Sequence, residues 1–371
     1  MTTIPEPATL RFGQPVMPDE AELLRLMAEV LRSGRLTNGG PLHARLEAEL
    51  ELQIGGPLRL TSSGTMAVML ALRLGGLPAG GEVITSPLSF AASVQAIDWC
   101  GLRPVFADVE PEFGTLCPKA VERAISPQTV AILGVHFQGI ACDVDALERI
   151  ARAHGLWLVF DAAQAPDLTW QGKSLCLAGD ASAMSLHATK LLTTAEGGAV
   201  VVRSQDHAER LARMRNFGLE GGRPTGPGIN GKLSEVHAAF GLAVLPRLKA
   251  ELRARAEVRR WYDEALSGLP VKVLAPRPDS SESHIYYTLQ VPPVRRASMI
   301  AALEREGIMP RVPFDLLCGP GTTHDGAPIH SGSGAVVVAD VAGSFLSLPL
   351  HGDMQPSDMA RAATALGRAL E

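Results

Sequence analysis

The chain has 371 residues, 46% hydrophobic and 20% charged, a composition typical of globular rather than disordered proteins. Its formal net charge of -5, without a basic run, argues against nucleic acid as a partner. Five scattered cysteines without a CxxC pair argue against a zinc site and a disulfide framework. Because neither a secretion signal nor a membrane-spanning apolar stretch is found, we expect a cytoplasmic protein with no membrane partner.

Apolar runs alternate with helical stretches in the first half of the chain and predict a seven-stranded sheet. These runs lie at 57–62, 82–87, 103–108, 129–136, 156–161, 181–186 and 197–202. Near-continuous apolar strands separated by helices, such as one expected at 143–155, are typical of a sheet covered on both faces. We therefore expect an α/β domain with a mostly parallel sheet.

The pattern changes after residue 230. Residues 232–267 are expected to be helical, with Pro246 kinking or dividing the helix. Beyond them we predict a strand at 283–291, an amphipathic helix at 295–308 and a long irregular loop at 316–334. The predicted organisation is therefore a large α/β domain over residues 1–250 and a smaller α+β domain over residues 251–371.

Three features fall where strands of the predicted sheet end, which is where open α/β sheets bind ligands. A helix that starts near Gly64 would offer free N–H groups to a phosphate, although it could simply be a capped helix. Asp161 ends an apolar strand and needs a cation or hydrogen bonds, or it could cap a helix. Lys190 lies in "SLHATKLLTTAEGG" and could be a nucleophilic amine or an ordinary surface lysine.

Each of these features is weak evidence alone, but they occur in one order along one α/β chain. Pyridoxal 5'-phosphate needs an anion site, a carboxylate for its ring nitrogen and an amine for a Schiff base. The three features together therefore predict a pyridoxal-phosphate enzyme. We expect no metal ion in the site.

Longer motifs carry a resemblance to a known family. They include "SSGTMAVMLAL", "VFDAAQA", "SLHATKLLTTAEGGAVVV", "GINGKLSE" and "SHIYYTL". From about residue 36 to residue 351 the chain resembles the DegT/DnrJ/EryC1/StrS family of sugar aminotransferases. The resemblance implies an aspartate-aminotransferase-like (type I) α/β fold that binds pyridoxal 5'-phosphate.

The resemblance also implies roles for individual residues. Lys190 would form the Schiff base, and Asp161 would pair with the ring nitrogen. Gln164 would lie near the phenolic oxygen of the cofactor. Phosphate binding would involve Gly64, Thr65 and Ser185, ring stacking Phe90, and substrate contacts His187, His284 and Tyr286.

Asn230 matches an asparagine that reaches the cofactor phosphate of the neighbouring subunit in the family, so a homodimer with shared active sites is expected. The middle residue of its turn, Ile229, departs from the tyrosine or threonine that is frequent in relatives. Cations for the donor carboxylate and the nucleotide diphosphate could come from loop residues among which the sequence does not decide. These candidates are Arg215, Arg223, Lys232 and Arg311.

The resemblance favours transfer of an amino group from L-glutamate to a nucleotide-linked 4-keto-6-deoxy sugar, giving dTDP-4-amino-4,6-dideoxyglucose. A 3-keto-sugar aminotransferase of the same family is the alternative. A sugar dehydratase of the family would carry histidine in place of Lys190, and a non-catalytic relative would lack Lys190 or Asp161. A lyase acting on sulfur amino acids shares only the fold and the lysine, and a nicotinamide enzyme would need a GxGxxG motif that is missing from the first βα unit.

Overall fold

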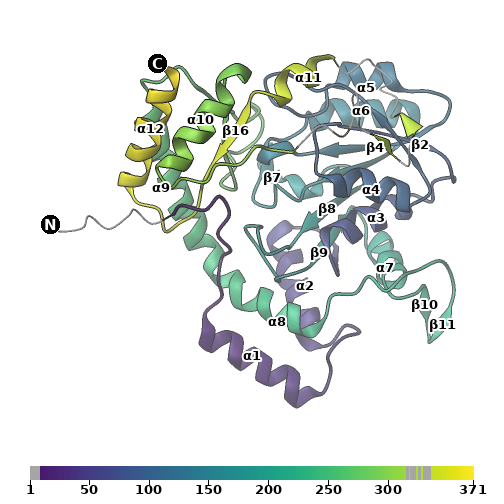
Figure 1. Cartoon of the computed structure of the whole chain (residues 1–371). Coiled ribbons are helices and arrows are strands. Elements are labelled where there is room, and N and C mark those ends of the chain that lie inside the picture. Colours follow the sequence, from purple (N-terminus) through teal and green to yellow (C-terminus); the bar gives the residue numbers. More distant parts are fainter. Residues whose placement is uncertain (1–8, 315–316, 318–322, 325–326, 329–335) are drawn as a thin grey trace.

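A seven-stranded sheet forms the centre of the molecule (Figure 1). The computed structural model describes residues 9–314, 317, 323–324, 327–328 and 336–371. The strands follow one another across the sheet in the order β1 (Leu58–Thr61), β9 (Gly198–Val202), β8 (Ala181–Ser185), β5 (Trp157–Asp161), β4 (Thr129–Val135), β2 (Glu82–Thr85) and β3 (Arg103–Phe106). Each of the seven predicted strands is present. All neighbouring strands are parallel except β9, which is antiparallel to both β1 and β8.

Helices cover both faces of this sheet because its strands present apolar side chains on both sides. One face packs against α3 (Gly64–Leu74), α4 (Ala91–Trp99) and α7 (Gln205–Met214). The opposite face packs against α1 (Glu20–Ser33), α2 (Pro41–Ile54), α5 (Pro118–Ala124), α6 (Val144–His154) and α8 (Glu235–Val244). The predicted helix at 143–155 is thus confirmed as α6. Short hairpins extend from the sheet: β6 (Thr169–Trp170) with β7 (Lys173–Ser174), and β10 (Leu219–Glu220) with β11 (Arg223–Pro224).

A second, antiparallel sheet lies beside the first. It consists of β12 (Lys272–Val273), β13 (Tyr287–Gln290) and β16 (Phe345–Leu348), and it packs on α9 (Leu248–Leu266), α10 (Pro293–Arg305) and α12 (Pro356–Leu370). These helices lie to the left of the central sheet in Figure 1. The structure also describes α11 (Val336–Ala342), β14 (Thr323–His324) and β15 (Ala327–Pro328), and short 3-10 helices cover Phe137–Gly139 and Leu175–Leu177. The predicted domain border at 250/251 falls inside α9.

Pro246 divides the long helical stretch as predicted, because a 3-10 turn over Leu245–Arg247 separates α8 from α9. The predicted strand at 283–291 is correct only in its second half, since β13 begins at Tyr287. The residues before it form a turn in which Ser283 Oγ accepts a hydrogen bond from the backbone N–H of Ile285. His284 and Tyr286 therefore lie in this turn and not in a strand.

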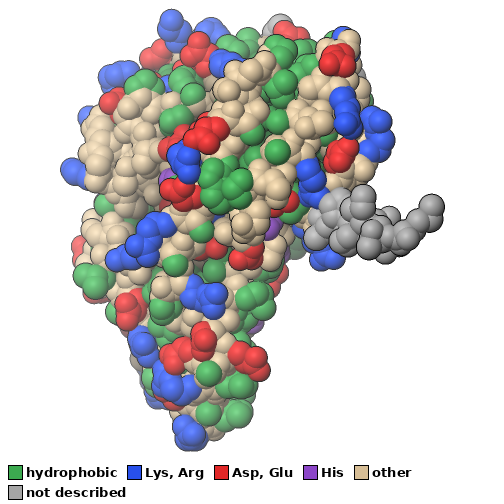
Figure 2. Space-filling model, turned by 90° about the vertical axis from the view of Figure 1, so that its left-hand side faces the viewer, with side chains coloured by type: hydrophobic (Ala, Val, Ile, Leu, Met, Phe, Trp, Pro, Cys, Tyr) green, Lys and Arg blue, Asp and Glu red, His purple; other side chains and the backbone are tan. Residues whose placement is uncertain are grey.

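The predicted loop at 316–334 lies for the most part outside the described residues. Among the residues that are described, no helix is long and apolar enough to cross a membrane. Acidic and basic side chains are interspersed over the face shown in Figure 2.

Candidate active site

The first turn of α3 offers free hydrogen-bond donors. Ser63 caps the helix, because its Oγ accepts from Met66 N at 3.1 Å and its carbonyl accepts from Ala67 N at 3.0 Å. The N–H groups of Gly64 and Thr65 have no acceptor among the described residues. The two hypotheses for this segment, a capped helix and an anion-binding helix start, are therefore compatible. The helix is capped, and it still has two free donors and its positive dipole end for an anion.

The start of α3 touches the end of β8 at Gly64. A Cβ atom at Gly64 would lie 2.8 Å from the Cβ of Ser185, too close for any larger residue without a shift. Ser185 ends β8, which runs parallel to β5 and places Ala183 opposite Asp161, two residues before Ser185. The helix terminus, Ser185 and the end of β5 thus meet at one edge of the sheet.

Asp161 is the last residue of β5 and is only 7% exposed. Its Oδ1 accepts from Ala163 N at 3.0 Å, and its Oδ2 accepts from the Ser93 hydroxyl at 2.8 Å. Ser89 Oγ lies 2.8 Å from Ser93 Oγ and extends this set of hydroxyls. The alternative of a helix cap is wrong, because a turn follows Asp161 instead of a helix. These neutral donors satisfy only part of a carboxylate's capacity and leave room for a cationic partner.

The amide of Gln164 has a fixed orientation. Its Oε1 accepts from the backbone N–H of Gln138 at 2.7 Å, and a backbone N–H can only donate, so the oxygen must face that group. The Nε2 of Gln164 then points elsewhere and has no acceptor among the described residues. It is therefore available to donate to a ligand oxygen.

Lys190 ends a turn in which its N–H donates to the carbonyl of His187 at 2.9 Å. Its side chain is half-buried, whereas the next residues, Leu191 and Leu192, are buried. The Lys190 amine makes no hydrogen bond or ion pair with any described residue. An amine beside the sheet edge that is not committed to a carboxylate is free to react with a carbonyl group.

Phe90 stands at the N-terminus of α4, and the residue is 56% exposed. The same helix carries Ser93, which bonds Asp161, so the ring is anchored to the same edge of the sheet. Phe314 is its aromatic neighbour, with ring centroids 5.5 Å apart. The exposed face suits stacking on a flat ligand rather than the alternative of a core aromatic.

The three predicted substrate residues are placed at two points. His187 Nδ1 lies 3.0 Å from Thr189 Oγ1 and its Nε2 lies 3.6 Å from Glu196, so it belongs to the Lys190 turn. His284 Nδ1 lies 3.5 Å from the buried carboxylate of Asp167. The Tyr286 ring stacks on Phe12 at 5.6 Å with an interplanar angle of 9°. Contacts with Asp167 and Phe12 were not predicted, because each joins segments far apart in the sequence.

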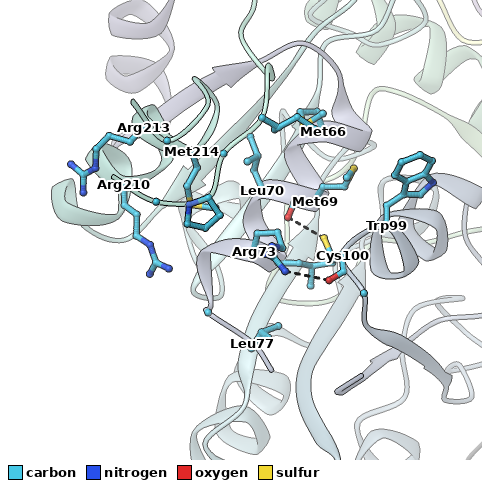
Figure 3. Close-up of a pocket in the computed structure, with 18 of the residues that line it drawn as sticks. Met66, Met69, Leu70, Arg73, Leu77, Trp99, Cys100, Arg210, Arg213 and Met214 are labelled. Atoms are coloured by element: carbon cyan, nitrogen blue, oxygen red, sulfur yellow. Dashed lines mark hydrogen bonds between the residues drawn. The ribbon is translucent and has the colours of Figure 1, made fainter. Parts of the chain in front are cut away.

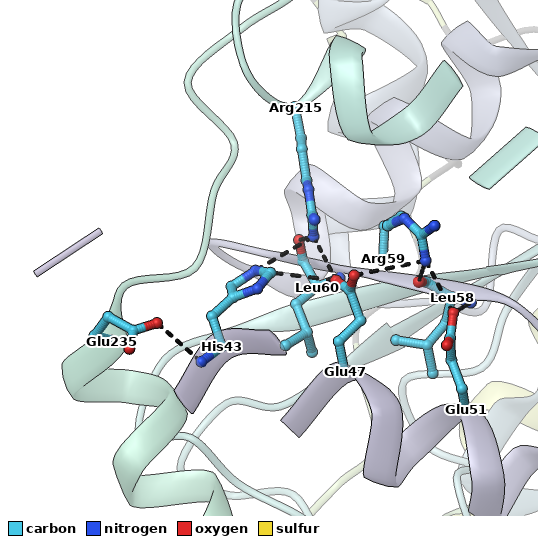
Figure 4. A network of polar contacts seen from close by, with 8 residues as sticks. All are labelled: His43, Glu47, Glu51, Leu58, Arg59, Leu60, Arg215 and Glu235. Carbon is cyan, nitrogen blue, oxygen red and sulfur yellow. Dashed lines mark hydrogen bonds and ion pairs between the residues drawn. The ribbon is translucent and has the colours of Figure 1, made fainter. Parts of the chain in front are cut away.

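The four candidate cations differ sharply. Arg215 is buried, and its guanidinium donates to Glu47 at 2.7 Å and to the Leu60 carbonyl at 2.6 Å (Figure 4). It is therefore committed to the fold and unavailable to a ligand. Arg223 is exposed in the β10–β11 hairpin.

Lys232 and Asn230 form one unit at the end of the 216–231 loop. The Lys232 amine donates to Asn230 Oδ1 at 2.7 Å and lies 4.8 Å from the centre of the Phe217 ring. Burial, followed by the charge of Arg215, lowers the pKa of Lys232. The loop is tied to the α3 start, because Ser62 N donates to the Gly231 carbonyl at 2.8 Å. Asn230 itself is exposed.

Arg311 lies differently. Its guanidinium carbon is 5.5 Å from the ring centres of both Phe12 and Phe314. It lines a cavity of about 180 Å³ together with Thr189 and Tyr286. It has no carboxylate partner among the described residues. Of the four candidates, Arg311 is the one next to the Lys190 turn and free to meet an anion.

A comparison with protein families matches residues 18–367 to the DegT/DnrJ/EryC1/StrS aminotransferase family. The chain belongs to this family. It is therefore a sugar aminotransferase, as the sequence predicted, and such enzymes depend on pyridoxal 5'-phosphate.

Among the relatives of this aminotransferase is the dTDP-4-amino-4,6-dideoxy-D-glucose transaminase of Shigella dysenteriae, with 32% identity over 92% of this chain and 94% of that protein. The GDP-perosamine synthase of Caulobacter vibrioides is 32% identical over 83% of this chain and 84% of its own. The solved structure of DesI, described as containing its TDP-sugar product, superposes with a TM-score of 0.88 and 33% identity, covering 96% of this chain and 92% of that one. The aminotransferase TlmJ of Streptoalloteichus hindustanus gives a TM-score of 0.89 at 27% identity, covering 98% and 99% of the two chains. The predicted fold class is confirmed.

The residues at the sheet edge fit the cofactor of the family. Two open N–H groups and Ser185 suit a phosphate, the Asp161 carboxylate suits a protonated ring nitrogen, and the Gln164 amide suits a phenolic oxygen. Lys190 supplies the amine. The chemistry of the donors present therefore agrees with pyridoxal 5'-phosphate.

Proposed function

We propose that this sugar aminotransferase moves an amino group from L-glutamate to a nucleotide-linked 4-keto-6-deoxy sugar and yields dTDP-4-amino-4,6-dideoxyglucose. The observation that carries the proposal is the name shared by two full-length relatives, the dTDP-4-amino-4,6-dideoxy-D-glucose transaminases of Shigella dysenteriae and Escherichia coli, which align with 92% and 93% of this chain. The TDP-sugar described in the DesI structure supports thymidine diphosphate as the carrier. A nucleotide-linked substrate also supports the expected cytoplasmic location.

The cofactor would be held by the residues at the sheet edge. Gly64 and Thr65 would donate to its phosphate from the start of α3, and Ser185 would donate from the end of β8. Phe90 would cover the ring. Asp161 would hold the proton on the ring nitrogen, since its two hydrogen bonds from neutral donors keep it an acceptor.

When bound, pyridoxal 5'-phosphate withdraws electrons from the carbon that carries the migrating amino group. Lys190 would take the proton from the α-carbon of the donor amino acid through its Nζ and later deliver a proton on the sugar side. Such a shuttle needs an amine that is released from other partners and sits beside the reacting carbon. The uncommitted amine at the end of its turn supports this role.

The donor carboxylate needs a cation, and we assign this role to Arg311. Two aromatic rings hold its guanidinium, which has no carboxylate partner in the part of the chain that the structure describes. The cavity that Arg311 lines reaches Thr189, the neighbour of Lys190. Arg255 lines the same cavity but is paired with Glu251 at 2.6 Å. A carboxylate in this cavity would therefore meet Arg311 rather than Arg255. His187, His284 and Tyr286 would contact the sugar.

The proposed working form is a homodimer in which Asn230 reaches the phosphate site of the second copy. A groove of about 860 Å³ runs beside α3, α4 and the 216–231 loop and is lined mainly by apolar side chains, including Met66, Met69 and Trp99 (Figure 3). Trp99 is 77% exposed. A second copy on this face would cover the groove next to the loop that carries Asn230, which supports the dimer.

The absorbance of the cofactor tests the function. Adding L-glutamate to the pyridoxal-phosphate-loaded enzyme should convert the visible absorbance of the lysine-bound cofactor to near-ultraviolet absorbance, and dTDP-4-keto-6-deoxyglucose should restore it. Lys190→Ala should lose the visible band and turnover, whereas Lys173→Ala, on exposed β7, should keep both. An active Lys190→Ala enzyme would show that the assignment of the lysine is wrong. Restoration by a 3-keto sugar alone would replace the proposed substrate by the alternative of the same family.

A further inference from the structure

A turn at the end of β4 connects the two sheets of the molecule through Gln138. On one side, the backbone N–H of Gln138 donates to Gln164 Oε1 at 2.7 Å. On the other side, Gln138 Oε1 accepts from Ser347 Oγ at 2.9 Å and from Thr288 Oγ1 at 3.2 Å. All four residues are buried. Buried hydrogen bonds of this kind fix geometry, because no water is available to replace a lost partner.

The small sheet presents the two hydroxyls together. Thr288 and Ser347 are paired residues on β13 and β16, and their hydroxyl oxygens are 2.8 Å apart. Ser347 also exchanges two backbone hydrogen bonds with Arg311, at 2.9 and 2.8 Å. The residue that anchors Gln138 is therefore also the residue that anchors the proposed carboxylate-binding arginine.

The turn itself is held by its surroundings. Gln138 has φ of 51°, a backbone conformation that residues other than glycine seldom adopt. The next residue, Gly139, has φ of 74°, and a Cβ atom there would lie 2.2 Å from Ser283 Oγ. Such conformations persist only where neighbours enforce them, and the neighbours of this turn include Ser283 beside Gly139 and the hydroxyls of Thr288 and Ser347 beside the Gln138 side chain.

We propose that Gln138 is a positioning residue that couples the small sheet to the cofactor: Thr288 and Ser347 fix its side chain, and its backbone N–H then turns the Gln164 amide so that Nε2 faces the phenolic oxygen of pyridoxal phosphate. The inference rests on the proposed placement of the cofactor beside Gln164. We call the hydrogen bonds from Thr288 and Ser347 through Gln138 to Gln164 the relay. A hydrogen bond from Nε2 favours the ionised phenolic oxygen, so the relay influences the pH at which the bound chromophore titrates. The relay also joins the donor side of the site, through Arg311, to the cofactor side.

The test removes the hydroxyls of the small sheet without touching the site. Thr288→Val combined with Ser347→Ala keeps the approximate shape and deletes both donors to Gln138. The visible absorbance of the loaded enzyme is measured against pH, and cofactor affinity is measured by reconstituting the apoprotein. We expect the spectral transition to move to higher pH, in the same direction as in Gln164→Ala. Cofactor binding should weaken roughly fivefold, the effect of about one hydrogen bond.

A matched control comes from the same strand. Tyr287 is next to Thr288 on β13, and its side chain faces the opposite side of the strand. Tyr287→Phe removes the hydrogen bond of 2.7 Å that the Tyr287 hydroxyl donates to Asp263. This variant should titrate like the wild type. Thr288→Ser keeps the hydroxyl and should also titrate like the wild type. If the double variant does not fold, Ser347→Ala alone should still shift the transition in the same direction.

The outcomes separate the proposals. The first outcome is a shifted transition in Gln164→Ala with a normal transition in the folded double variant. This result would overturn the relay and leave the cofactor placement standing. If the double variant does not fold, a normal transition in Ser347→Ala would have the same meaning. An unshifted transition in Gln164→Ala would overturn both the relay and the placement of Gln164. A wild-type protein without visible absorbance after incubation with pyridoxal phosphate would overturn the proposed function of the site itself.

Discussion

His43 is a buried imidazole that resists protonation in the folded protein. Burial, then the neighbouring charge of Arg215, lowers its pKa to about 4, whereas an unfolded histidine titrates near 6.5. Arg59 acts in the same direction and the Glu47 carboxylate opposes it. Between these pH values the unfolded chain binds more protons than the folded chain, so the contribution of His43 is present above pH 6.5 and is lost as the pH falls toward 4.

The size of this loss can be measured. The difference between the pKa of His43 in the unfolded and the folded chain corresponds to about 3 kcal/mol of unfolding free energy. This contribution is expected to disappear as the pH falls from 6.5 to about 4. His43→Gln keeps a hydrogen-bond acceptor near Arg215 but cannot titrate, so its unfolding free energy should fall less steeply in urea titrations across this range. Parallel pH profiles for the two proteins would contradict the prediction.

The N-terminus of α2 shows how one element depends on another. Its first turn follows Gly40, which has no side chain to cap the helix. The carboxylate of Glu235, at the start of α8, instead accepts from Leu42 N and His43 N, both at 2.9 Å. Figure 4 shows the contact with His43. An acidic side chain at this position also suits the positive end of the helix dipole. One helix thus supplies the cap of its neighbour and fixes how the two pack.

Glycine at position 40 is required by this contact. A Cβ atom there would lie 2.6 Å from Cδ of Glu235, so Gly40→Ala should displace the carboxylate and lower the unfolding free energy by about 1–3 kcal/mol. Gly268→Ala is the control, because a Cβ atom at Gly268 meets nothing within 4 Å. Thermal unfolding of both variants checks the prediction, and an equal change in midpoint would count against it.

At the scale of the whole molecule, the proposed dimer predicts that two defective chains can complement each other. In a mixed dimer of Asn230→Ala and Lys190→Ala chains, one site would combine an intact Lys190 with the partner's intact Asn230. Refolding the two variants together should therefore give more turnover than the sum of the separate variants. Turnover equal to that sum would mean that Asn230 acts within its own chain or not at all. Size-exclusion chromatography with light scattering gives the oligomeric state of each sample.

The sequence predicted the elements of the central sheet because each strand is an apolar run of its own with turn residues at both ends. The α3 start could be located from "TSSGT", and Pro246 marked the break in the helical stretch, since both signals are local. The start of β13 could not be located from the sequence. The backbone N–H groups of Ile285 and His284 donate to Ser283 and Asp167, and these hydrogen bonds keep the residues before Tyr287 out of the strand. Similarly, "VHFQG" gave no sign that Gln138 reaches across to β13 and β16.

The sequence by itself therefore determined the fold class, the family and the types of residue at the site, because these depend on local periodicity and on contiguous motifs. Only the tertiary structure decided which side chains are bound to partners within the protein and which are available to a ligand. It buried Arg215 against Glu47, left Arg311 open between two aromatic rings, and oriented Gln164 through Gln138. The contacts of Arg215 with Glu47, of Gln164 with Gln138 and of Arg311 with Phe12 all join segments far apart in the sequence. Loop residues of the same type are indistinguishable until those segments are packed together.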